Sequence, residues 1–347
     1  MSAHPSSTGD RNRIVCFGEL LMRLSAPGHE RLLQTPQLQT TFGGAEANVA
    51  VSLAILGHRA AVVSTLPDNA IGHTCAGELR RHGVDVADIC FDDGRMGLYF
   101  LSPGAMQRPS EVLYDRAGSA FAMAPADTYD WPRLLADAQW LHVSGITPAL
   151  GDNTAQAALS AVRAARAVGT RVSFDCNYRG KLWGKQAAQA PRRLCELAAE
   201  ADLLFGNDRD VALMLGMEFP QADAGERFRA AAKAAFATWP HLQRMATTGR
   251  HHHSVDEQDL VGMLADADAV RVTDAHALRG IVDRVGAGDA FAAGLLHGLL
   301  QGMDDAAALD FAVAAACLKH SIPGDVNLLG EEAVRAFLAG DGFEVKR

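Results

Sequence analysis

Apolar and polar residues follow two different periods along the chain, and these periods predict its elements. Short, nearly continuous apolar runs indicate buried strands, whereas longer segments with apolar residues three or four positions apart indicate helices. Strands are predicted at 13–18, 60–65, 140–145, 171–177, 202–207 and 244–249. Helices are predicted at 45–57, 71–83, 154–169, 190–201, 224–239, 289–302 and 305–320. This alternation predicts an α/β fold with a mostly parallel sheet covered on both faces.

Two segments in the first third of the chain follow another pattern. At 97–105 and 111–120 apolar and polar residues alternate over short stretches, which predicts an antiparallel hairpin outside the main sheet. The chain has no internal repeat, low-complexity stretch or Pro/Gly-rich linker. We therefore expect a disordered tail at 1–12 and a single α/β domain at 13–347 with a small β lid.

Composition limits the classes of partner. The net charge is −9, so the protein has no basic excess with which to bind nucleic acid or an anionic membrane surface. No apolar run reaches the length of a membrane span, and the six cysteines are scattered without a CxxC pair. We expect a cytoplasmic protein without nucleic-acid or membrane partners, in which local groups bind any anionic ligand.

A glycine-rich turn near the C-terminus carries the first candidate chemistry. In the sequence Gly286-Ala287-Gly288-Asp289, the glycines permit positive φ angles and let backbone N–H groups converge. The helix that follows adds the positive end of its dipole, so the turn predicts an anion hole. Asp289 has two interpretations: it caps the helix, or it is a general base that takes a proton from a hydroxyl beside the anion.

Other motifs do not support a different nucleotide-binding fold. The turn has Phe291 where a dinucleotide fingerprint requires glycine, and it does not follow the first strand. The segment 180–186 is one residue short of a P-loop and lacks Ser or Thr after Lys185. The histidines at 251–253 have no spaced carboxylate or cysteine partner, so we interpret them as a loop and not as a metal site.

Two stretches resemble the signatures of a known family. Residues 283–294 (DRVGAGDAFAAG) resemble the C-terminal signature of the ribokinase-like (PfkB) carbohydrate kinases, and residues 42–57 (FGGAEANVAVSLAILG) resemble their N-terminal signature. The two occur in the family's order, and the resemblance runs from about 13 to 340. Finer stretches resemble one branch, the 2-keto-3-deoxygluconate kinases, at 97–120, 140–150, 174–183 and 318–329.

The resemblance implies a ribokinase-like three-layer α/β/α sandwich, with a β-clasp lid whose strands come from about 19–42 and 91–120. It also implies transfer of a phosphoryl group from ATP, assisted by Mg²⁺, to the 6-hydroxyl of 2-keto-3-deoxygluconate. The product would be 2-keto-3-deoxy-6-phosphogluconate. The expected partners are the sugar acid, ATP and further copies of the chain in a homo-oligomer.

The family's functional residues can be carried over where its motifs match. Asp289 matches the catalytic base, and Gly286, Ala287 and Gly288 match the anion hole. The residues that match sugar-binding positions are Gly43, Gly44, Asn48, Tyr99, Tyr114, Arg116, Arg179 and Asp325. The residues that match the nucleotide site are Asn177, Asn207, Asp210, Thr247, Gly249, Gly286 and Gly288.

Two of the nucleotide-site segments depart from the family pattern. The phosphate–magnesium motif NxxE reads NDRD, in which Asp210 is one methylene shorter than Glu. We therefore expect Asp210 to reach Mg²⁺ through a water, and we assign no direct metal ligand. The segment at 247–253 reads TTGRHHH, in which only Gly249 is retained.

The proposed substrate carries a carboxylate, which an acidic protein must pair with a local cation. Arginine binds carboxylates through two parallel hydrogen bonds, and Arg116 and Arg179 are suitably placed for this. A neutral sugar such as ribose or fructose would leave both arginines unpaired. Those sugars and 5-dehydro-2-deoxygluconate are the alternative substrates. A non-catalytic sugar-sensing protein on the same fold is the alternative from another class.

Overall fold

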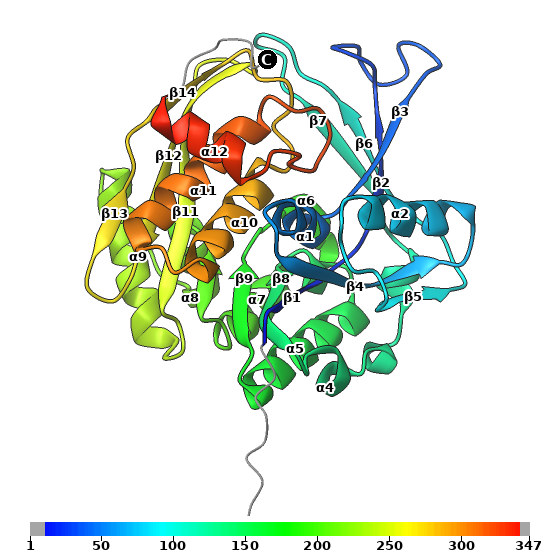
Figure 1. The fold of residues 1–347 in the computed structure, drawn as a ribbon, viewed down its shortest axis with the longest axis horizontal. Helices are drawn as coiled ribbons and strands as arrows, with labels where there is room; N and C mark the ends of the chain where they lie inside the picture. The colour runs from blue at the N-terminus through cyan, green and yellow to red at the C-terminus, as the bar shows by residue number, and fades with distance from the viewer. Residues whose placement is uncertain (1–10, 341–347) are drawn as a thin grey trace, which may run out of the picture.

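The computed structural model describes residues 11–340 (Figure 1). Positions 1–10 of the expected tail lie outside the described residues, and its last two positions contact the domain. Arg11 Nη1 donates to the carbonyl of Val168 at 2.5 Å, and Asn12 Oδ1 accepts from Arg59 at 2.7 Å. Among the helices of residues 11–340, none has the length and apolar character that crossing a bilayer requires.

The main sheet is parallel through most of its width. Its strands lie in the order β13 (Val270–Val272), β12 (Glu257–Ala265), β11 (Arg244–His252), β10 (Leu203–Phe205), β9 (Arg171–Asp175), β8 (Ala138–Ser144), β1 (Arg13–Phe17), β4 (Arg59–Pro67) and β5 (Ile89–Asp92). Every neighbouring pair from β11 to β5 is parallel. The predicted α/β architecture is therefore confirmed.

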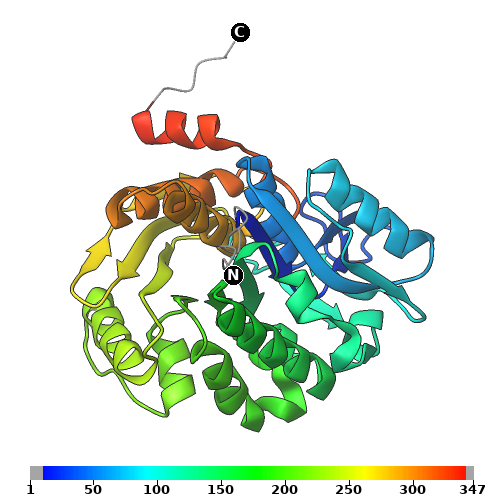
Figure 2. The same ribbon diagram turned by 60° about the horizontal axis from the view of Figure 1, so that its bottom comes forward.

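Helices cover both faces of this sheet because its strands are apolar on both sides. In β1, Ile14 and Cys16 pack against the helices α1 (Ala45–Ile55), α2 (Ala70–Arg81), α10 (Ala287–Leu300) and α11 (Asp305–Lys319). Val15 and Phe17 point to the other core, against α5 (Asp152–Val168), α7 (Ala190–Ala198), α8 (Asp208–Leu215) and α9 (Ala224–Thr238). Figure 2 shows the orange α10 and α11 and the green α5 and α7 on opposite sides of the strands.

Short helices complete the connections. They are α3 (Ala120–Met123), α4 (Trp131–Leu134), α6 (Gly180–Trp183), α12 (Glu331–Ala339) and the 3-10 turns η1 (Ala126–Thr128), η2 (Thr147–Ala149) and η3 (Gly184–Gln189).

A second, four-stranded sheet stands apart from the main one. Its order is β3 (Gln39–Gly43), β2 (Leu21–Ser25), β6 (Gly97–Ser102) and β7 (Glu111–Asp115). The hairpin expected from the alternating pattern is the antiparallel pair β6–β7, in which Tyr99 lies opposite Tyr114. In Figure 1 this sheet rises above the carboxyl ends of the parallel strands, next to the cavity described below.

One edge of the main sheet differs from the prediction. β12 runs antiparallel to β11, and β13 and β14 (His276–Arg279) both pair with β12. β11 pairs with β12 from Met245 through His252, so the interpretation of the histidines as a loop is wrong for His251 and His252. The hairpin was not predicted, although β12 contains the apolar run 260–265 (LVGMLA), because such a run does not show in which direction a strand pairs.

Candidate active site

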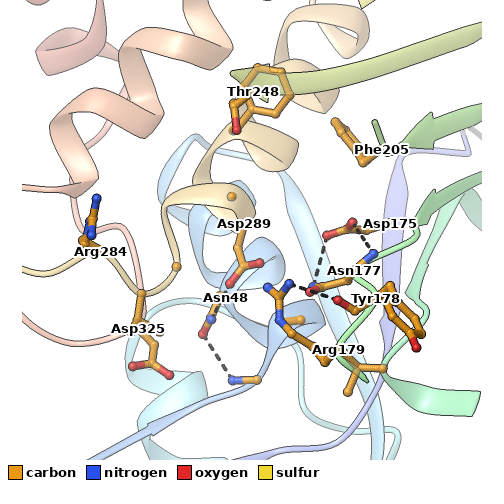
Figure 3. Close-up of a pocket in the computed structure, with 18 of the residues that line it drawn as sticks. Asn48, Asp175, Asn177, Tyr178, Arg179, Phe205, Thr248, Arg284, Asp289 and Asp325 are labelled. Atoms are coloured by element: carbon orange, nitrogen blue, oxygen red, sulfur yellow. Dashed lines mark hydrogen bonds between the residues drawn. The ribbon is translucent and has the colours of Figure 1, made fainter. Parts of the chain in front are cut away.

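A cavity of about 520 Å³ lies at the carboxyl ends of the parallel strands, beside the second sheet (Figure 3). Ligands of open α/β sheets bind at this edge. Loops after β9 and β10, the end of β11, the first turns of α1 and α10 and the strands β6 and β7 all contribute to its lining. The site therefore joins segments that are far apart in the sequence.

The glycine turn has the conformation that its sequence predicts. Gly286 has a φ of 80°, in the left-handed region. A Cβ at this position would lie 1.7 Å from the carbonyl oxygen of Asp325, so only glycine fits. Gly286 and Gly288 line the cavity, whereas Ala287 is buried and does not. The two glycines predicted to form an anion hole thus lie where a ligand in the cavity can reach them.

Asp289 lies on the first turn of α10 and faces the cavity (Figure 3). Its Oδ2 accepts a hydrogen bond of 2.6 Å from Nδ2 of Asn48, which comes from α1. The N-cap position of α10 is occupied by Gly286, and Asp289 is the third residue inside the helix. The interpretation of Asp289 as a helix cap is therefore wrong, and its carboxylate is available to a ligand.

Burial gives the Asp289 carboxylate the properties of a base. Burial raises its pKa to about 7, the hydrogen bond from Asn48 opposes this shift, and the charges of Asp325 and Glu46 add to it. A carboxylate with a pKa near neutrality binds a proton much more readily than an exposed one does. Such a group is suited to general-base catalysis at neutral pH.

The loop after β9 contributes a second group of polar side chains. Asn177 has a φ of 40°, and its Oδ1 is buried without a hydrogen-bond partner among the described residues. Its Nδ2 donates to Asp175 at 3.3 Å. Within residues 11–340, the guanidinium of Arg179 makes one long hydrogen bond, of 3.5 Å, to the carbonyl of Tyr178. Unsatisfied polar groups in a cavity are available to a ligand.

Two further acids of the cavity have raised pKa values. Burial raises the pKa of Asp175 to about 8, and the charge of Asp289 is the next largest cause. Burial also raises the pKa of Asp210. Negative charge is therefore costly at this edge of the site, and a cation that arrives with the ligand would relieve that cost.

The NDRD motif has a structural role as well as a place in the cavity. Asn207 Oδ1 accepts from the backbone N–H of Asp210 at 3.2 Å, and Asp210 Oδ2 accepts from the backbone N–H of Asn207 at 2.9 Å. This reciprocal capping box begins α8. Both residues line the cavity. Within residues 11–340, no group of three or more His, Cys, Asp or Glu side chains forms a metal site.

The sugar-binding residues predicted on the second sheet lie over the same cavity. Tyr99 and Tyr114 line it, and the hydroxyl of Tyr99 donates to Asp325 Oδ2 at 2.5 Å. Asp325 also accepts from the buried Arg23 at 2.7 Å, and Arg23 pairs with Asp283 at 2.7 Å. Sequence reasoning missed Arg23, because nothing in its local pattern indicates partners about 300 residues away.

Arg116 is less free than the sequence predicted. Its Nε donates to Glu19 Oε2 at 2.5 Å, and both side chains are buried. Ser119 donates to the other oxygen of Glu19. Arg116 still lines the cavity, and its Nη1 and Nη2 make no hydrogen bond with a described residue. The pair with Glu19 holds the guanidinium in place and offsets its charge.

Three predicted site residues do not line the cavity, whereas several residues that were not predicted do. Ala287, Gly43 and Gly249 are outside the lining. A Cβ on Gly43 would lie 2.4 Å from Asp325, and one on Gly249 would lie 2.8 Å from Val261. These two glycines thus allow close packing next to the site. The unpredicted lining residues include three polar ones from β11 and from the segment before the glycine turn: Thr248, Arg250 and Arg284.

Comparisons with known proteins identify the family of the chain. The model of the pfkB family carbohydrate kinases matches residues 11–240 and 264–329. The chain therefore belongs to the pfkB family of carbohydrate kinases, enzymes that transfer a phosphoryl group to an alcohol.

Individual relatives are similar over nearly the whole chain. The crystal structure of 2-dehydro-3-deoxygluconokinase from Thermotoga maritima is 38% identical with a TM-score of 0.90, covering 95% of this chain and 100% of that one. A 2-dehydro-3-deoxygalactonokinase of Haloferax volcanii is 33% identical over 96% of this chain and 99% of its own length. A 2-dehydro-3-deoxygluconokinase of Bacillus subtilis is 29% identical over 94% and 95%.

Proposed function

We propose that this kinase transfers the γ-phosphoryl group of ATP to the 6-hydroxyl of 2-keto-3-deoxygluconate. The observation that carries the proposal is the position of the Asp289 carboxylate, in the same cavity as the glycine turn and two arginines that can bind a carboxylate. Relatives named for 2-dehydro-3-deoxy sugar acids support the choice of substrate.

The reaction can be written with the residues of this chain. Asp289 takes the proton of the 6-hydroxyl while the oxygen forms a bond to the γ-phosphorus, and the bond from that phosphorus to the ADP oxygen breaks. The N–H groups at Gly286 and Gly288 stabilise the charge on the transferring group. Asn48 holds Asp289 in position through its 2.6 Å hydrogen bond. ADP and the 6-phosphorylated sugar acid then leave.

The carboxylate of the substrate has two candidate partners. Arg179 has no acidic hydrogen-bond partner among the described residues and lies beside Asp289 in Figure 3. Arg116 is held by Glu19 through Nε, which leaves its two Nη groups for a ligand. Tyr114 also lines the cavity, and its hydroxyl makes no hydrogen bond with a described residue. A planar guanidinium is well matched to a carboxylate, and a neutral sugar would leave it unpaired.

Mg²⁺ fits this site as an ion that arrives with the nucleotide. Proteins usually bind Mg²⁺ through one or two carboxylates together with substrate phosphates and waters. Asp210 lines the cavity, and one of its oxygens already accepts from Asn207, so a contact through water suits it best. When bound, the ion would neutralise charge on the β- and γ-phosphates.

The test is turnover across a panel of substrates. With ATP and Mg²⁺, the enzyme should phosphorylate 2-keto-3-deoxygluconate or its galactonate-derived epimer far faster than ribose or fructose. Arg179→Lys should raise the KM for the sugar acid, because a single ammonium cannot form the paired hydrogen bonds. Equal or better turnover on a neutral sugar would overturn the choice of substrate. Failure to phosphorylate any member of the panel would favour a non-catalytic sensor.

A further inference from the structure

Arg284 lies immediately before the glycine turn and lines the cavity without an acidic partner among the described residues. Its Nη2 donates to Oε1 of Gln258 at 2.7 Å and also contacts Nδ1 of His252. A guanidinium can only donate, so both partners act as neutral acceptors. Arg284 is therefore held in place with its positive charge uncompensated by these contacts.

A buried hydrogen-bond chain fixes the orientation of Gln258. Gln258 is fully buried, and its Nε2 lies 2.8 Å from Nε2 of His320, which is also buried. His320 Nδ1 lies 2.6 Å from the carbonyl of Ala316, so this nitrogen carries the proton and Nε2 accepts from Gln258. Burial lowers the pKa of His320 to about 4, which keeps the ring neutral. The amide oxygen of Gln258 must then face Arg284.

Arg250 adds a second charge without a fixed partner. It lies near the outer end of β11 and lines the cavity, and its guanidinium makes no hydrogen bond with a described residue. Arg250 is an exposed residue, and the positive charges of Arg284 and Arg179 act on its guanidinium. Three guanidinium groups thus interact within one cavity of an acidic protein. Their mutual repulsion would be relieved by a ligand that carries several negative charges.

We propose that Arg284 and Arg250 form a subsite for the polyphosphate of the nucleotide, and that Gln258 and His320 position Arg284 for it. This proposal rests on the proposed function, since it assigns a ligand to one end of that active site. It gives the kinase a fixed source of positive charge next to the glycine turn. This charge matters because Asp210 is one methylene shorter than the Glu of the family motif and is engaged in a capping box. Asp210 would therefore contribute less than that Glu to holding a metal ion.

The position of the contacts favours the nucleotide over the sugar acid. The partners of Arg284 belong to β11 and β12, the hairpin that also carries Thr247, Thr248 and Arg250. In Figure 3, Arg284 lies on the opposite side of Asp289 from Arg179, and its side chain points away from Asp325. The residues of the second sheet, which cover the sugar end, make no hydrogen bond with Arg284.

The experiment measures binding by calorimetry with three ligands: ATP, adenosine and the sugar acid. Arg284→Gln should weaken ATP binding about 10- to 100-fold, the value of one or two charge-assisted hydrogen bonds, and leave adenosine and the sugar acid within about threefold. Arg250→Gln should act in the same direction. Arg279→Gln is the matched control, because Arg279 lies on the neighbouring β14 and outside the cavity lining.

Gln258→Met tests the positioning role. The substitution removes the amide that accepts from Arg284, methionine is about as long as glutamine, and the charge of Arg284 is unchanged. Gln258→Met should raise the KM for ATP about tenfold with little change in kcat. Gln258→Asn should have a KM for ATP close to that of Gln258→Met, because its shorter side chain does not bring the amide to Arg284. Weaker binding of the sugar acid with unchanged ATP affinity would overturn the subsite and assign the arginines to the substrate carboxylate. Equal loss for ATP and adenosine would also overturn it. Neither result depends on which sugar is phosphorylated. The test of the polyphosphate subsite is therefore independent of the test of the substrate.

Discussion

At the scale of single residues, the site depends on one carboxylate whose surroundings change its chemistry. Asp289 is half-buried beside the glycine turn, and its Oδ2 accepts a hydrogen bond from Asn48. The hydrogen bond fixes its direction, while burial raises its affinity for a proton. Asp127, by contrast, is exposed and lies outside the cavity lining. Burial, and not residue type, makes this aspartate a candidate base.

Asp289→Asn should remove the base and keep the shape of the site. We expect turnover to fall about 10²- to 10⁴-fold, the usual value of general-base catalysis, with sugar-acid binding retained. Steady-state kinetics and calorimetry measure the two quantities. Asp127→Asn, at an exposed position outside the cavity lining, is the control and should have no effect on either. Turnover retained in Asp289→Asn would show that another group takes the proton.

The pH dependence follows from the raised pKa of Asp289. The base must be ionised, so kcat/KM for the sugar acid should rise with pH and level off above about 7. The residual activity of Asp289→Asn should lack this rise.

The contribution of Asp289 to the free energy of unfolding should fall as pH rises, whereas the activity should increase. Because the pKa is higher in the folded than in the unfolded chain, the native state holds the proton more tightly, and this stabilisation is lost as pH rises towards 7. The free energy of unfolding of Asp289→Asn, relative to the unmodified enzyme, should therefore increase from about pH 5 to about pH 8. Denaturant unfolding at both pH values measures it, and no change would contradict the raised pKa.

At the scale of elements, ion pairs connect the second sheet to the loops around α10 and α11. Arg23 on β2 pairs with Asp283, before the glycine turn, and with Asp325, after α11. Tyr99 on β6 donates to the same Asp325. The ammonium of Lys319 donates to the carbonyls of Ile322 and Gly324 at 3.0 and 2.6 Å. These contacts hold the segment whose backbone packs against Gly286.

Arg23→Met should destabilise the fold strongly, because it leaves two buried carboxylates without their shared cation. The expected loss in the free energy of unfolding is about 3–5 kcal/mol, measured by urea denaturation. Arg81→Met removes a largely exposed arginine that pairs with Glu78 on α2, and should cost no more than about 0.5 kcal/mol. A similar small cost at Arg23 would mean that the network does not connect the sheet to the loops.

At the scale of the whole molecule, ligand and fold should stabilise each other. The cavity draws its lining from both sheets and from both cores' helices, so a ligand that fills it contacts segments from most of the chain. Anything that binds only the folded state raises its stability, by about 2.7 kcal/mol at a concentration of one hundred times Kd. A thermal-stability measurement can therefore identify the substrate without an activity assay.

Differential scanning calorimetry in the presence of sugar acids and neutral sugars tests this coupling. The sugar acid should raise the Tm, and ribose or fructose at the same concentration should leave it unchanged, because neither has a charge for Arg179. In Arg179→Lys the shift caused by the sugar acid should become smaller. An equal shift with ribose would contradict the role of the arginine.

The sequence determined the elements that local patterns specify. The parallel strands, their helices, the β6–β7 hairpin and the glycine turn each follow from periodicity or from glycine's backbone freedom, which depend on neighbouring residues alone. The antiparallel edge at β12–β14 did not follow, although β12 contains the apolar run 260–265 (LVGMLA), because an apolar run does not show in which direction a strand pairs. The resemblance to a kinase family supplied most of the candidate site, including Asp289.

Only the tertiary structure decided which side chains meet and which are free. Asn48 and Asp289 are 241 residues apart, and Arg23 and Asp325 are 302 apart. Contacts of this kind depend on how the whole chain closes. For the same reason the sequence could not show that Glu19 engages Arg116 or that Arg284 is held by neutral groups. Burial and charge pairing are properties of the assembled molecule, and they set the pKa and the availability of every group in the site.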